Sequence, residues 1–303
     1  MDKLKIGYFS GGIRGFVCLE KLIKSDFDIS FVLHNGKQNS IEHLENICID
    51  NQIQIIVAST NSDIYNKVSD YQCNLFILSG FNSIISSKII NLPNLGTINL
   101  HSGKLPEYRG ASVLNWQIIN GEKQIELNIM WVTEEIDAGK VILKTSFDLL
   151  PSDNINTVVK KTTKQFPKLL INAIREICKN PNFGYLQDET KAAYYCKRYE
   201  KDGQVNWRMS SAENIHNLIR ALKPPYPGAF SFYKNKKIVF DQSELISDNI
   251  FGIPGRIARR YKDGIVIIAS DRGLLIKSII FDGKIYNGKE IYKILSIGED
   301  FDK

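Results

Sequence analysis

The sequence predicts an α/β protein with a Rossmann-like, mainly parallel sheet, followed by a small C-terminal β-barrel domain. Through roughly the first 180 residues, short apolar runs of strand length alternate with segments of helical periodicity, as in βαβ units. From Ser231 onward, strand-like runs follow one another with only turns between them. We therefore expect a first domain over residues 1–203 and a second over residues 204–303.

The first domain contains the alternating elements. We expect strands at Lys5–Phe9, Ile29–Leu33, Ile53–Val57, Leu75–Leu78, Thr97–Leu100, Glu126–Val132 and Val141–Phe147. Helical patterns follow the first strand to about Lys24 and then cover Ile41–Asp50, Asp63–Asp70 and Ser112–Asn120. Ser40 is a candidate N-cap. A last, long helix ends near Lys179, and Pro167 is expected to kink or break it.

Composition narrows the class of protein. The chain has 303 residues, of which 43% are hydrophobic and 24% charged. Its apolar runs are shorter than the ~20 residues needed to span a bilayer. The five cysteines are scattered without a CxxC pair, which disfavours a disulfide framework or a zinc site. These features predict a cytoplasmic protein without membrane insertion and without a metal.

The charge is unevenly distributed. The net charge is +6, and residues 204–303 carry 16 Lys and Arg against 11 Asp and Glu. Such a surplus is typical of an ordinary solvated surface, and equally of a protein that attracts an anionic substrate such as a nucleotide or RNA.

Three polar residues between Asn94 and Val141 are candidates for chemistry: Asn99, His101 and Asp137. Side chains alternate along a strand, so Asn99 and His101 should share one face and Leu100 the other. Residues of these types more often form turns, caps or satisfied side chains than active sites. Spacing alone therefore leaves their role open.

The segment NLHSGKLPEYRGASVLNW, with EEIDAGKVI further on, resembles the signature of the folate-dependent formyltransferases. The resemblance implies that Asn99, His101 and Asp137 catalyse transfer of a formyl group from the co-substrate 10-formyltetrahydrofolate to an amine. Asn99 would donate a hydrogen bond to the developing oxyanion, His101 would carry a proton, and Asp137 would orient the imidazole. This chemistry needs no metal.

The resemblance also implies where the folate binds. The family holds the pterin with the backbone of one loop, which matches Ser83, Ile84 and Ile85 here, and with a second loop, which matches Thr133, Glu134, Glu135, Ile136 and Asp137. Core packing is the alternative role for Ile84 and Ile85. Some relatives have an Arg that touches folate directly after the YRG motif, where this chain has Ala111.

The second half of the chain extends the resemblance. The pieces NWRMS, IHNLIRAL and PPYPGAF are similar to the segment that joins the two domains in larger formyltransferases, closest to those acting on nucleotide-linked amino sugars. The similarity implies an OB-like barrel, a homodimer, and an acceptor such as a UDP- or dTDP-4-amino-4,6-dideoxyhexose. Such an enzyme would serve surface polysaccharide, including lipopolysaccharide, biosynthesis.

Five residues are candidates for holding the acceptor. Gly11 and Gly12 lie between a strand and a helix N-terminus, a corner suited to anions, although a tight turn alone would explain them. Arg14 and Arg220 are candidates for phosphate contacts, and Tyr226 for a contact with the base. Arg220 has an alternative role as a cation at a helix end, and the segment around Tyr226 as a rigid turn.

Two rival functions differ from this prediction. Methionyl-tRNA formyltransferases share the two-domain plan, but they carry a long basic insertion after the second strand. Here that loop is HNGKQNS, with Lys37 as its single lysine, so we expect no nucleic-acid partner. A non-enzymatic nucleic-acid-binding module is the other rival, and the presence of Asn99, His101 and Asp137 together argues against it.

Overall fold

The computed structural model describes residues 3–36 and 41–301, which group into two compact units. The first unit comprises Met1–Gly110, Gln124–Phe147 and Val159–Tyr195, and the second comprises Ala111–Lys123, Asp148–Val158 and Cys196–Lys303. Each unit is thus assembled from separate stretches of sequence. The domain boundary after residue 203 stays a prediction, and Lys37 and Ser40 lie outside the described residues.

The first unit is built on a seven-stranded sheet in the order β3-β2-β1-β4-β5-β7-β8. The strands are β1 (Lys5–Ser10), β2 (Asp28–His34), β3 (Gln54–Val57), β4 (Leu75–Ser79), β5 (Thr97–His101), β7 (Gln124–Trp131) and β8 (Val141–Asp148). Strands β3, β2, β1, β4 and β5 pair in parallel, whereas β7 runs antiparallel to β5. The predicted α/β fold with a mainly parallel sheet is confirmed.

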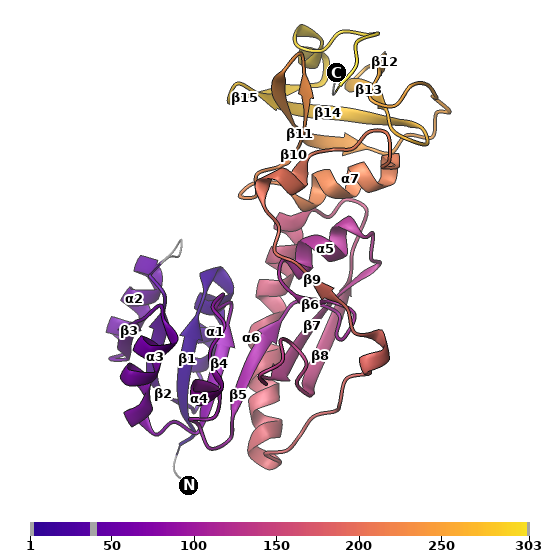
Figure 1. Cartoon of the computed structure of the whole chain (residues 1–303). Helices are drawn as coiled ribbons and strands as arrows, with labels where there is room; N and C mark the ends of the chain where they lie inside the picture. Colours follow the sequence, from indigo (N-terminus) through magenta and orange to yellow (C-terminus); the bar gives the residue numbers. More distant parts are fainter. Residues whose placement is uncertain (1–2, 37–40, 302–303) are drawn as a thin grey trace. The chain divides into compact units, whose positions relative to one another are not determined.

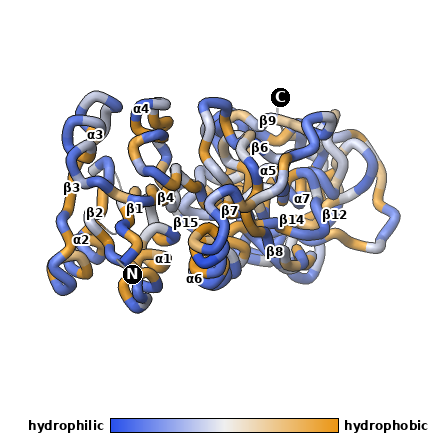
Figure 2. Tube along the Cα trace, turned by 90° about the horizontal axis from the view of Figure 1, so that it is seen from below, coloured by the Kyte–Doolittle hydropathy of each residue, from blue (hydrophilic) through white to orange (hydrophobic). Residues whose placement is uncertain are grey.

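Helices cover both faces of this sheet. Helices α1 (Gly12–Ile23), α2 (Ile41–Asp50) and α6 (Ile155–Lys179) lie on one face, and α3 (Asn61–Val68) and α4 (Ser87–Ile90) on the other (Figures 1 and 2). Strands covered on both faces bury nearly every side chain, which explains the continuous apolar runs in β1 and β4. Phe9, Phe31 and Phe76 meet edge to face in this core.

Helix α6 continues through Pro167, so of the expected kink or break the break is wrong and the kink stays a prediction. An interior proline costs a helix roughly 3 kcal/mol. Phe166, Leu170 and Ile174 on this helix are fully buried, and each such side chain contributes about 1.5–3 kcal/mol. Packing of the apolar face therefore outweighs the local preference of one residue.

The second unit contains a six-stranded antiparallel sheet in the order β10-β11-β14-β13-β12, with β15 paired to β14. The strands are β10 (Ala229–Tyr233), β11 (Lys236–Glu244), β12 (Ile257–Tyr261), β13 (Gly264–Ile268), β14 (Gly273–Phe281) and β15 (Lys284–Asn287). Helices α5 (Val113–Ile119) and α7 (Ala212–Ala221) belong to this unit and contact each other. The predicted C-terminal β domain is confirmed. Within the described residues, no helix is both long and apolar enough to cross a bilayer.

Candidate active site

Strand β5 presents the first two candidate residues. Its residues Ile98 and Leu100 are buried toward one face, and Asn99 and His101 lie on the other, as the alternation of a strand requires. The cross-strand partners of Asn99 and His101 on β7 are Met130 and Asn128. The shared face expected from the sequence is thus present, on a strand held between β4 and β7.

Both ring nitrogens of His101 have defined neighbours. Nε2 lies 2.6 Å from the carbonyl oxygen of Tyr108, and because a carbonyl only accepts, Nε2 carries the hydrogen. Nδ1 lies 3.5 Å from Oδ1 of Asp137. In neutral His101, Nδ1 is therefore the nitrogen that can take up a proton, and a carboxylate stands beside it.

The loop after β5 leaves little space around this histidine. A Cβ on Gly103 would lie 2.3 Å from the carbonyl oxygen of Tyr108 and 2.5 Å from Nε2 of His101. Asn128 on β7 donates from Nδ2 to the carbonyl oxygen of Gly103 at 2.7 Å. Glycine at this position lets the loop close over the imidazole, and Asn128 holds it there.

Asp137 reaches the site from an unexpected direction. Because β7 is antiparallel to β5 and Trp131 pairs with Ile98, the loop after β7 starts at the edge of the sheet where β5 begins. The loop returns so that Asp137 faces His101 at the other end of β5. A contact between Trp131 and Gly139 closes this loop, because a Cβ on Gly139 would lie 1.9 Å from the carbonyl oxygen of Trp131.

The backbone at Asp137 is in the left-handed region, with φ +53°. This conformation is unfavourable for a residue with a side chain and needs support from its surroundings. One carboxylate oxygen, Oδ2, accepts from the Gly110 N–H at 2.9 Å. Gln187 donates from Nε2 to the carbonyl oxygens of Asp137 and Gly139, at 2.8 and 2.7 Å.

Behind Asp137 lies a network that the sequence reasoning missed. Arg109, on the two-residue strand β6 (Arg109–Gly110), is completely buried and donates to Gln187, Glu189 and Tyr194. The hydrogen bond that the Glu189 carboxyl accepts from Arg109 holds the pKa of this carboxyl below its ordinary value. The only sequence signal was the Arg inside the YRG motif, because its partners are 78 to 85 residues further along the chain.

The two loops expected to hold folate are largely exposed. After β4, Ile84 is 76% exposed whereas Ile85 is buried, so core packing explains Ile85 but not Ile84. Asn61 fixes this loop by donating to the carbonyl oxygen of Ile84 and accepting from the Ser86 N–H. In the second loop, Thr133–Ile136 are exposed, and the half-exposed Ile136 is its apolar member. Exposed apolar side chains such as Ile84 and Ile136 suit a flat heterocycle.

The glycine corner expected to hold an anion is tightly packed. A Cβ on Gly11 would lie 1.7 Å from the carbonyl oxygen of Gly80, and Gly12 has φ +58°. Arg14 donates from Nη1 to the carbonyl oxygen of Leu100 and to Oγ of Ser102. Arg14 therefore anchors the end of β5, and its role as a phosphate contact stays a prediction.

Arg220 and Tyr226 belong to the second unit. Arg220 donates to Oδ1 of Asn217 and to the carbonyl oxygens of Leu150 and Asp153. These contacts fit its alternative role as a structural cation at the end of α7. Tyr226 is 37% exposed in the turn after α7. Their roles toward the acceptor stay predictions.

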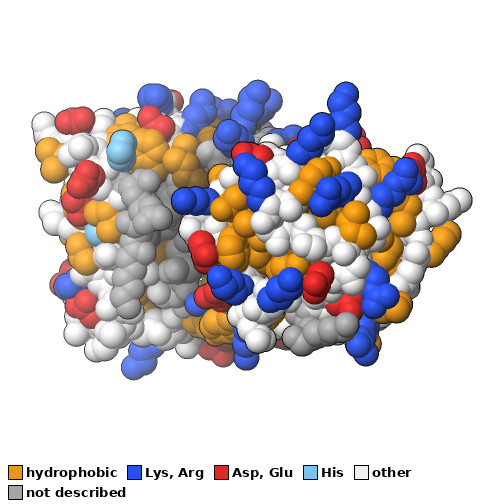
Figure 3. Space-filling model, turned by 90° about the horizontal axis from the view of Figure 1, so that it is seen from above, with side chains coloured by type: hydrophobic (Ala, Val, Ile, Leu, Met, Phe, Trp, Pro, Cys, Tyr) orange, Lys and Arg blue, Asp and Glu red, His pale blue; other side chains and the backbone are white. Residues whose placement is uncertain are grey.

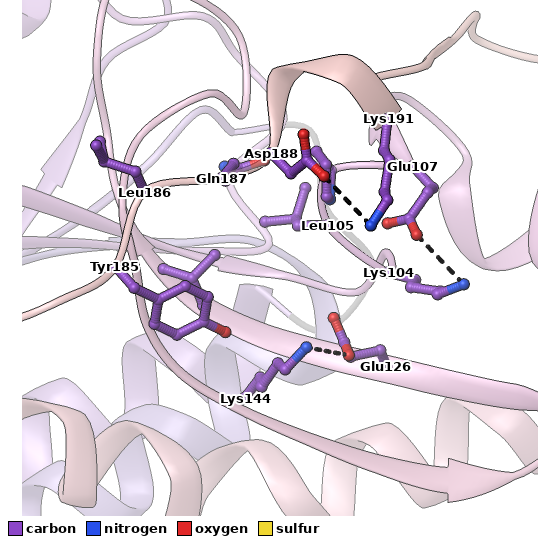
Figure 4. A pocket seen from close by; sticks show the side chains of 12 residues that line it. Lys104, Leu105, Glu107, Glu126, Lys144, Tyr185, Leu186, Gln187, Asp188 and Lys191 are labelled. Carbon is purple, nitrogen blue, oxygen red and sulfur yellow. Dashed lines mark ion pairs between the residues drawn. The ribbon is translucent and has the colours of Figure 1, made fainter.

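A cavity of about 270 Å³ adjoins this network in the first unit (Figure 4). Its charged side chains form three ion pairs, Lys104 with Glu107, Lys144 with Glu126 and Lys191 with Asp188. Gln187 and Tyr185 also line it. Because its charges are already paired, the cavity offers no unbalanced charge to a ligand.

Comparison with known families agrees with this arrangement. Residues 36–174 match the family model described as formyl transferase, and residues 198–295 match the model of the formyl transferase C-terminal domain. The two matches together cover most of the chain and include Asn99, His101 and Asp137.

Two relatives and one solved structure illustrate the similarity. The chain is 31% identical over 269 residues to the bifunctional polymyxin resistance protein ArnA of Wigglesworthia glossinidia brevipalpis, covering 84% of this chain but only 40% of that protein. It is 29% identical over 291 residues to the methionyl-tRNA formyltransferase of Clostridium acetobutylicum, covering 93% and 90% of the two chains. Its fold matches the N-formyltransferase of Helicobacter canadensis in complex with folinic acid and dTDP-3-aminofucose, with a TM-score of 0.69, 18% identity, and coverage of 91% and 98%.

Proposed function

The chain belongs to the formyl transferase family, and from that premise we propose that it moves a formyl group from 10-formyltetrahydrofolate to the amine of a nucleotide-linked amino sugar. The family makes it a formyl-transferring enzyme. The identity of the donor and acceptor and the roles of individual residues are the proposal.

In the proposed reaction, the amine nitrogen attacks the formyl carbon, a new C–N bond forms, and the bond to N10 of the folate breaks. As the amine attacks, the oxygen of the formyl carbonyl becomes an oxyanion, to which Asn99 donates a hydrogen bond. Among the described residues the side-chain amide of Asn99 has no hydrogen-bond partner, so it is available for this role.

Proton transfer involves His101 and Asp137. The attacking amine must lose a proton, and N10 must gain one. Nε2 of His101 is committed to the Tyr108 carbonyl, so the proton is exchanged at Nδ1, where Oδ1 of Asp137 stabilises the imidazolium. The group transfer balances without an oxidant or a covalent enzyme intermediate.

The folate would lie along the two loops that follow β4 and β7. Ser83 to Ile85 and Thr133 to Asp137 would supply backbone groups to the pterin. The exposed side chains of Ile84 and Ile136 support this assignment, because they offer apolar surface to a ring system. The neighbour from Helicobacter canadensis was solved with folinic acid, a related folate.

The short connection between β2 and α2 is the observation that favours a nucleotide sugar over tRNA as the acceptor. Strand β2 ends at His34 and α2 begins at Ile41, and the intervening sequence has a single lysine. A tRNA requires many phosphate contacts, and much of their affinity comes from Lys and Arg side chains. A nucleotide sugar carries only a diphosphate. The Helicobacter canadensis neighbour, in complex with a dTDP-amino sugar, is consistent with this class.

A formylation assay tests the proposal. The purified protein is incubated with 10-formyltetrahydrofolate and a panel of dTDP- and UDP-linked 3-amino and 4-amino sugars, and the products are identified by mass spectrometry. We expect one acceptor to gain 28 Da. A thermal-shift screen with UDP, dTDP, GDP and CMP identifies the base, because a nucleotide at 100 times its Kd stabilises the fold by about 2.7 kcal/mol. Absence of formylation across the panel would exclude this acceptor class.

Methionyl-tRNA formyltransferase is the second candidate, favoured by the relatives of that name that cover about 90% of the chain. The same assay with methionyl initiator tRNA tests it. Formylation of tRNA, with an affinity that falls steeply as salt is raised, would replace the sugar proposal. We expect neither.

The remaining parts of the proposal concern the cellular setting. An amino-sugar formyltransferase would serve surface polysaccharide, including lipopolysaccharide, biosynthesis in the cytoplasm, where nucleotide sugars are made. We also propose a homodimer. Loss of the formyl group from surface polysaccharide on deletion of the gene, and a mass of twice 34.4 kDa by light scattering, would support these two points.

A further inference from the structure

The turn that carries Asp137 is held by one amide group. Nε2 of Gln187 uses both of its hydrogens, one for the carbonyl oxygen of Asp137 and one for that of Gly139. These two carbonyls belong to either side of the turn in which Asp137 has φ +53°. Gln187 thereby stabilises a conformation that residues with a side chain rarely adopt, and with it the direction of the carboxylate.

The orientation of this amide is set by Arg109. Oε1 of Gln187 accepts from Nε and Nη2 of Arg109 at 3.1 and 2.9 Å. If the amide were flipped, its oxygen would face two carbonyl oxygens and its N–H groups would face the guanidinium donors. All four contacts would then be repulsive, so Arg109 allows only one orientation.

Arg109 is fixed in turn. Its other donors form a bidentate pair with the Glu189 carboxylate, at 2.9 and 2.6 Å, and a hydrogen bond to the Tyr194 hydroxyl at 2.9 Å. All five guanidinium N–H groups are thus used, and the side chain is completely buried. A buried guanidinium with all its donors used has one stable position, and its hydrogen bonds therefore also fix the position of the Gln187 amide.

The neighbours of Arg109 hold the reactive side chains directly. The carbonyl of Tyr108 accepts from His101, and the N–H of Gly110 donates to Oδ2 of Asp137. Strand β6 pairs with β9 (Tyr194–Tyr195), and Tyr108 stacks on Tyr195 at 4.7 Å between centroids. The segment from Gln187 to Tyr195 therefore braces the backbone that positions both His101 and Asp137.

From this geometry we propose that Gln187, oriented by Arg109, is a positioning residue that keeps the Asp137 carboxylate facing Nδ1 of His101. The proposal rests on Asn99, His101 and Asp137 carrying out formyl transfer. Gln187 touches neither substrate nor reacting atoms in this role and acts only through the turn at Asp137.

The test is a double-mutant cycle on kcat. Gln187→Met keeps the length of the side chain and removes its hydrogen bonds, and we expect kcat to fall about 10- to 100-fold because misplacing a reacting group is costly. In an Asp137→Ala background, the same change should alter kcat by less than about twofold, because the group that Gln187 positions is absent. Leu186→Ala is the matched control, since Leu186 is adjacent and 78% exposed, and kcat should stay at the wild-type value.

Other outcomes contradict the proposal. A purely structural role predicts a lower Tm with unchanged kcat in the folded protein, or an equal loss of kcat in both backgrounds. If Gln187→Met does not fold, Gln187→Glu takes its place, because it keeps an acceptor for Arg109 while removing the donors to the two carbonyls.

A second readout needs no acceptor. In crystal structures of the wild type and of the Gln187 variant, we expect the Asp137 carboxylate to move away from Nδ1 of His101 only in the variant. An unchanged turn would overturn the positioning role. If the wild type formylates none of the sugars offered, the proposed acceptor fails, whereas the crystal structures still decide on Gln187.

Discussion

His101 is held at both ring nitrogens, whereas the side chain of Asn99 on the same strand is not held among the described residues, and the two residues therefore differ in how far their role in catalysis can be separated from a role in folding. Nε2 donates to a backbone carbonyl, and Nδ1 faces Asp137. Asn99 on the same strand has no side-chain hydrogen bond among the described residues. Removing Asn99 should therefore cost the fold little, whereas the reaction would lose its oxyanion donor.

We expect Asn99→Ala, His101→Ala and Asp137→Ala each to lower kcat by roughly 10²–10⁴-fold, the usual effect of losing an oxyanion donor or a proton carrier. The Tm of Asn99→Ala should stay near that of the wild type, whereas His101→Ala and Asp137→Ala lose hydrogen bonds to Tyr108 and Gly110 and should have a lower Tm, so kcat is measured where each variant is folded. Asp137→Asn should keep the turn, because asparagine tolerates positive φ, while losing the charge beside the imidazole. Near-normal kcat in His101→Ala would show that the proposed proton transfer is wrong.

Gly103 should also be sensitive to substitution, although it performs no chemistry. A Cβ there would lie 2.3 Å from the Tyr108 carbonyl oxygen and 2.5 Å from Nε2 of His101, so the loop must move away from the imidazole. We expect Gly103→Ala to lower kcat at least about 10-fold. Gly283→Ala, in the turn between β14 and β15, has open space around the new Cβ but a strained φ of +73°, and it serves as the control for a glycine substitution that lowers stability alone. Equal kcat in Gly103→Ala and the wild type would contradict the close fit.

At this scale the sequence predicted part of the site. Strand alternation placed Asn99 and His101 on one face, and the structure agrees. The resemblance pointed to Asp137, and the structure brings it to His101. Gln187 and Arg109 were beyond local reasoning, because their hydrogen bonds join residues 48 to 85 positions apart. In addition, an arginine is expected at the surface unless its partners are known.

At the scale of elements, alternating strands and helices sufficed to predict the parallel part of the sheet, because βαβ connections allow few other arrangements. The direction of β7 was not predictable in this way. Strand β6 and helix α5 separate it from β5, and both directions fit its apolar pattern. That direction decides from which edge Asp137 approaches, so the geometry of the site depends on a feature that apolar pattern leaves undetermined.

The brace formed by β6, β9 and Glu189 should depend on pH. The hydrogen bond with Arg109 keeps the pKa of Glu189 below its ordinary value, so this carboxylate stabilises the folded state above about pH 4.3 and ceases to do so as the pH falls through its lowered pKa. Glu189→Gln should therefore lower Tm at neutral pH, and the difference from the wild type should shrink toward pH 3. Tm measured from pH 3 to pH 7 checks this. Glu290→Gln, at an exposed pair in the second unit, is the control, and a constant difference for Glu189→Gln would contradict the assignment.

At the scale of the whole molecule, the basic surplus of residues 204–303 is dispersed. Several of its cations pair with acidic residues, as in Lys277 with Glu244 and Asp263, and Arg256 with Asp300. On the face seen in Figure 3, Lys and Arg side chains are scattered among apolar and acidic ones. On this face, interspersed and partly paired charge suits an ordinary solvated surface better than a continuous nucleic-acid track.

The division of the chain into units was only partly predictable. The β domain was evident from its closely spaced strand-like runs, and its core cluster lies entirely within residues 205–301. However, the second unit also includes Ala111–Lys123 and Asp148–Val158, which precede the expected boundary. Helix α5 shows no local signal for this membership, because its partner α7 is about 100 residues away in sequence.

Cutting the chain at the expected boundary tests whether the β domain folds with its own core cluster, and how much residues 111–123 and 148–158 add to its stability. A fragment of residues 204–303 keeps the buried members of the core cluster of the β domain, including Trp207 and Phe240, so we expect it to fold cooperatively. It loses α5 and residues 148–158, which contribute the hydrogen bond from Asn115 to the Ala221 carbonyl and the acceptors for Arg220 at Leu150 and Asp153.

Each of these polar contacts contributes about 0.5–3 kcal/mol, and the face of α7 that meets α5 becomes exposed. The fragment should therefore unfold at clearly lower urea concentration than the second unit within the full chain. Arg220→Ala should destabilise the full chain more than the fragment, because in the fragment Arg220 has already lost Leu150 and Asp153 and keeps only its hydrogen bond to Asn217. Chemical denaturation followed by the fluorescence of Trp207 measures this, with Trp116 and Trp131 replaced by Phe in the full chain. An unfolded fragment would show that residues 111–123 and 148–158 are indispensable to the second unit and that the boundary after residue 203 is wrong.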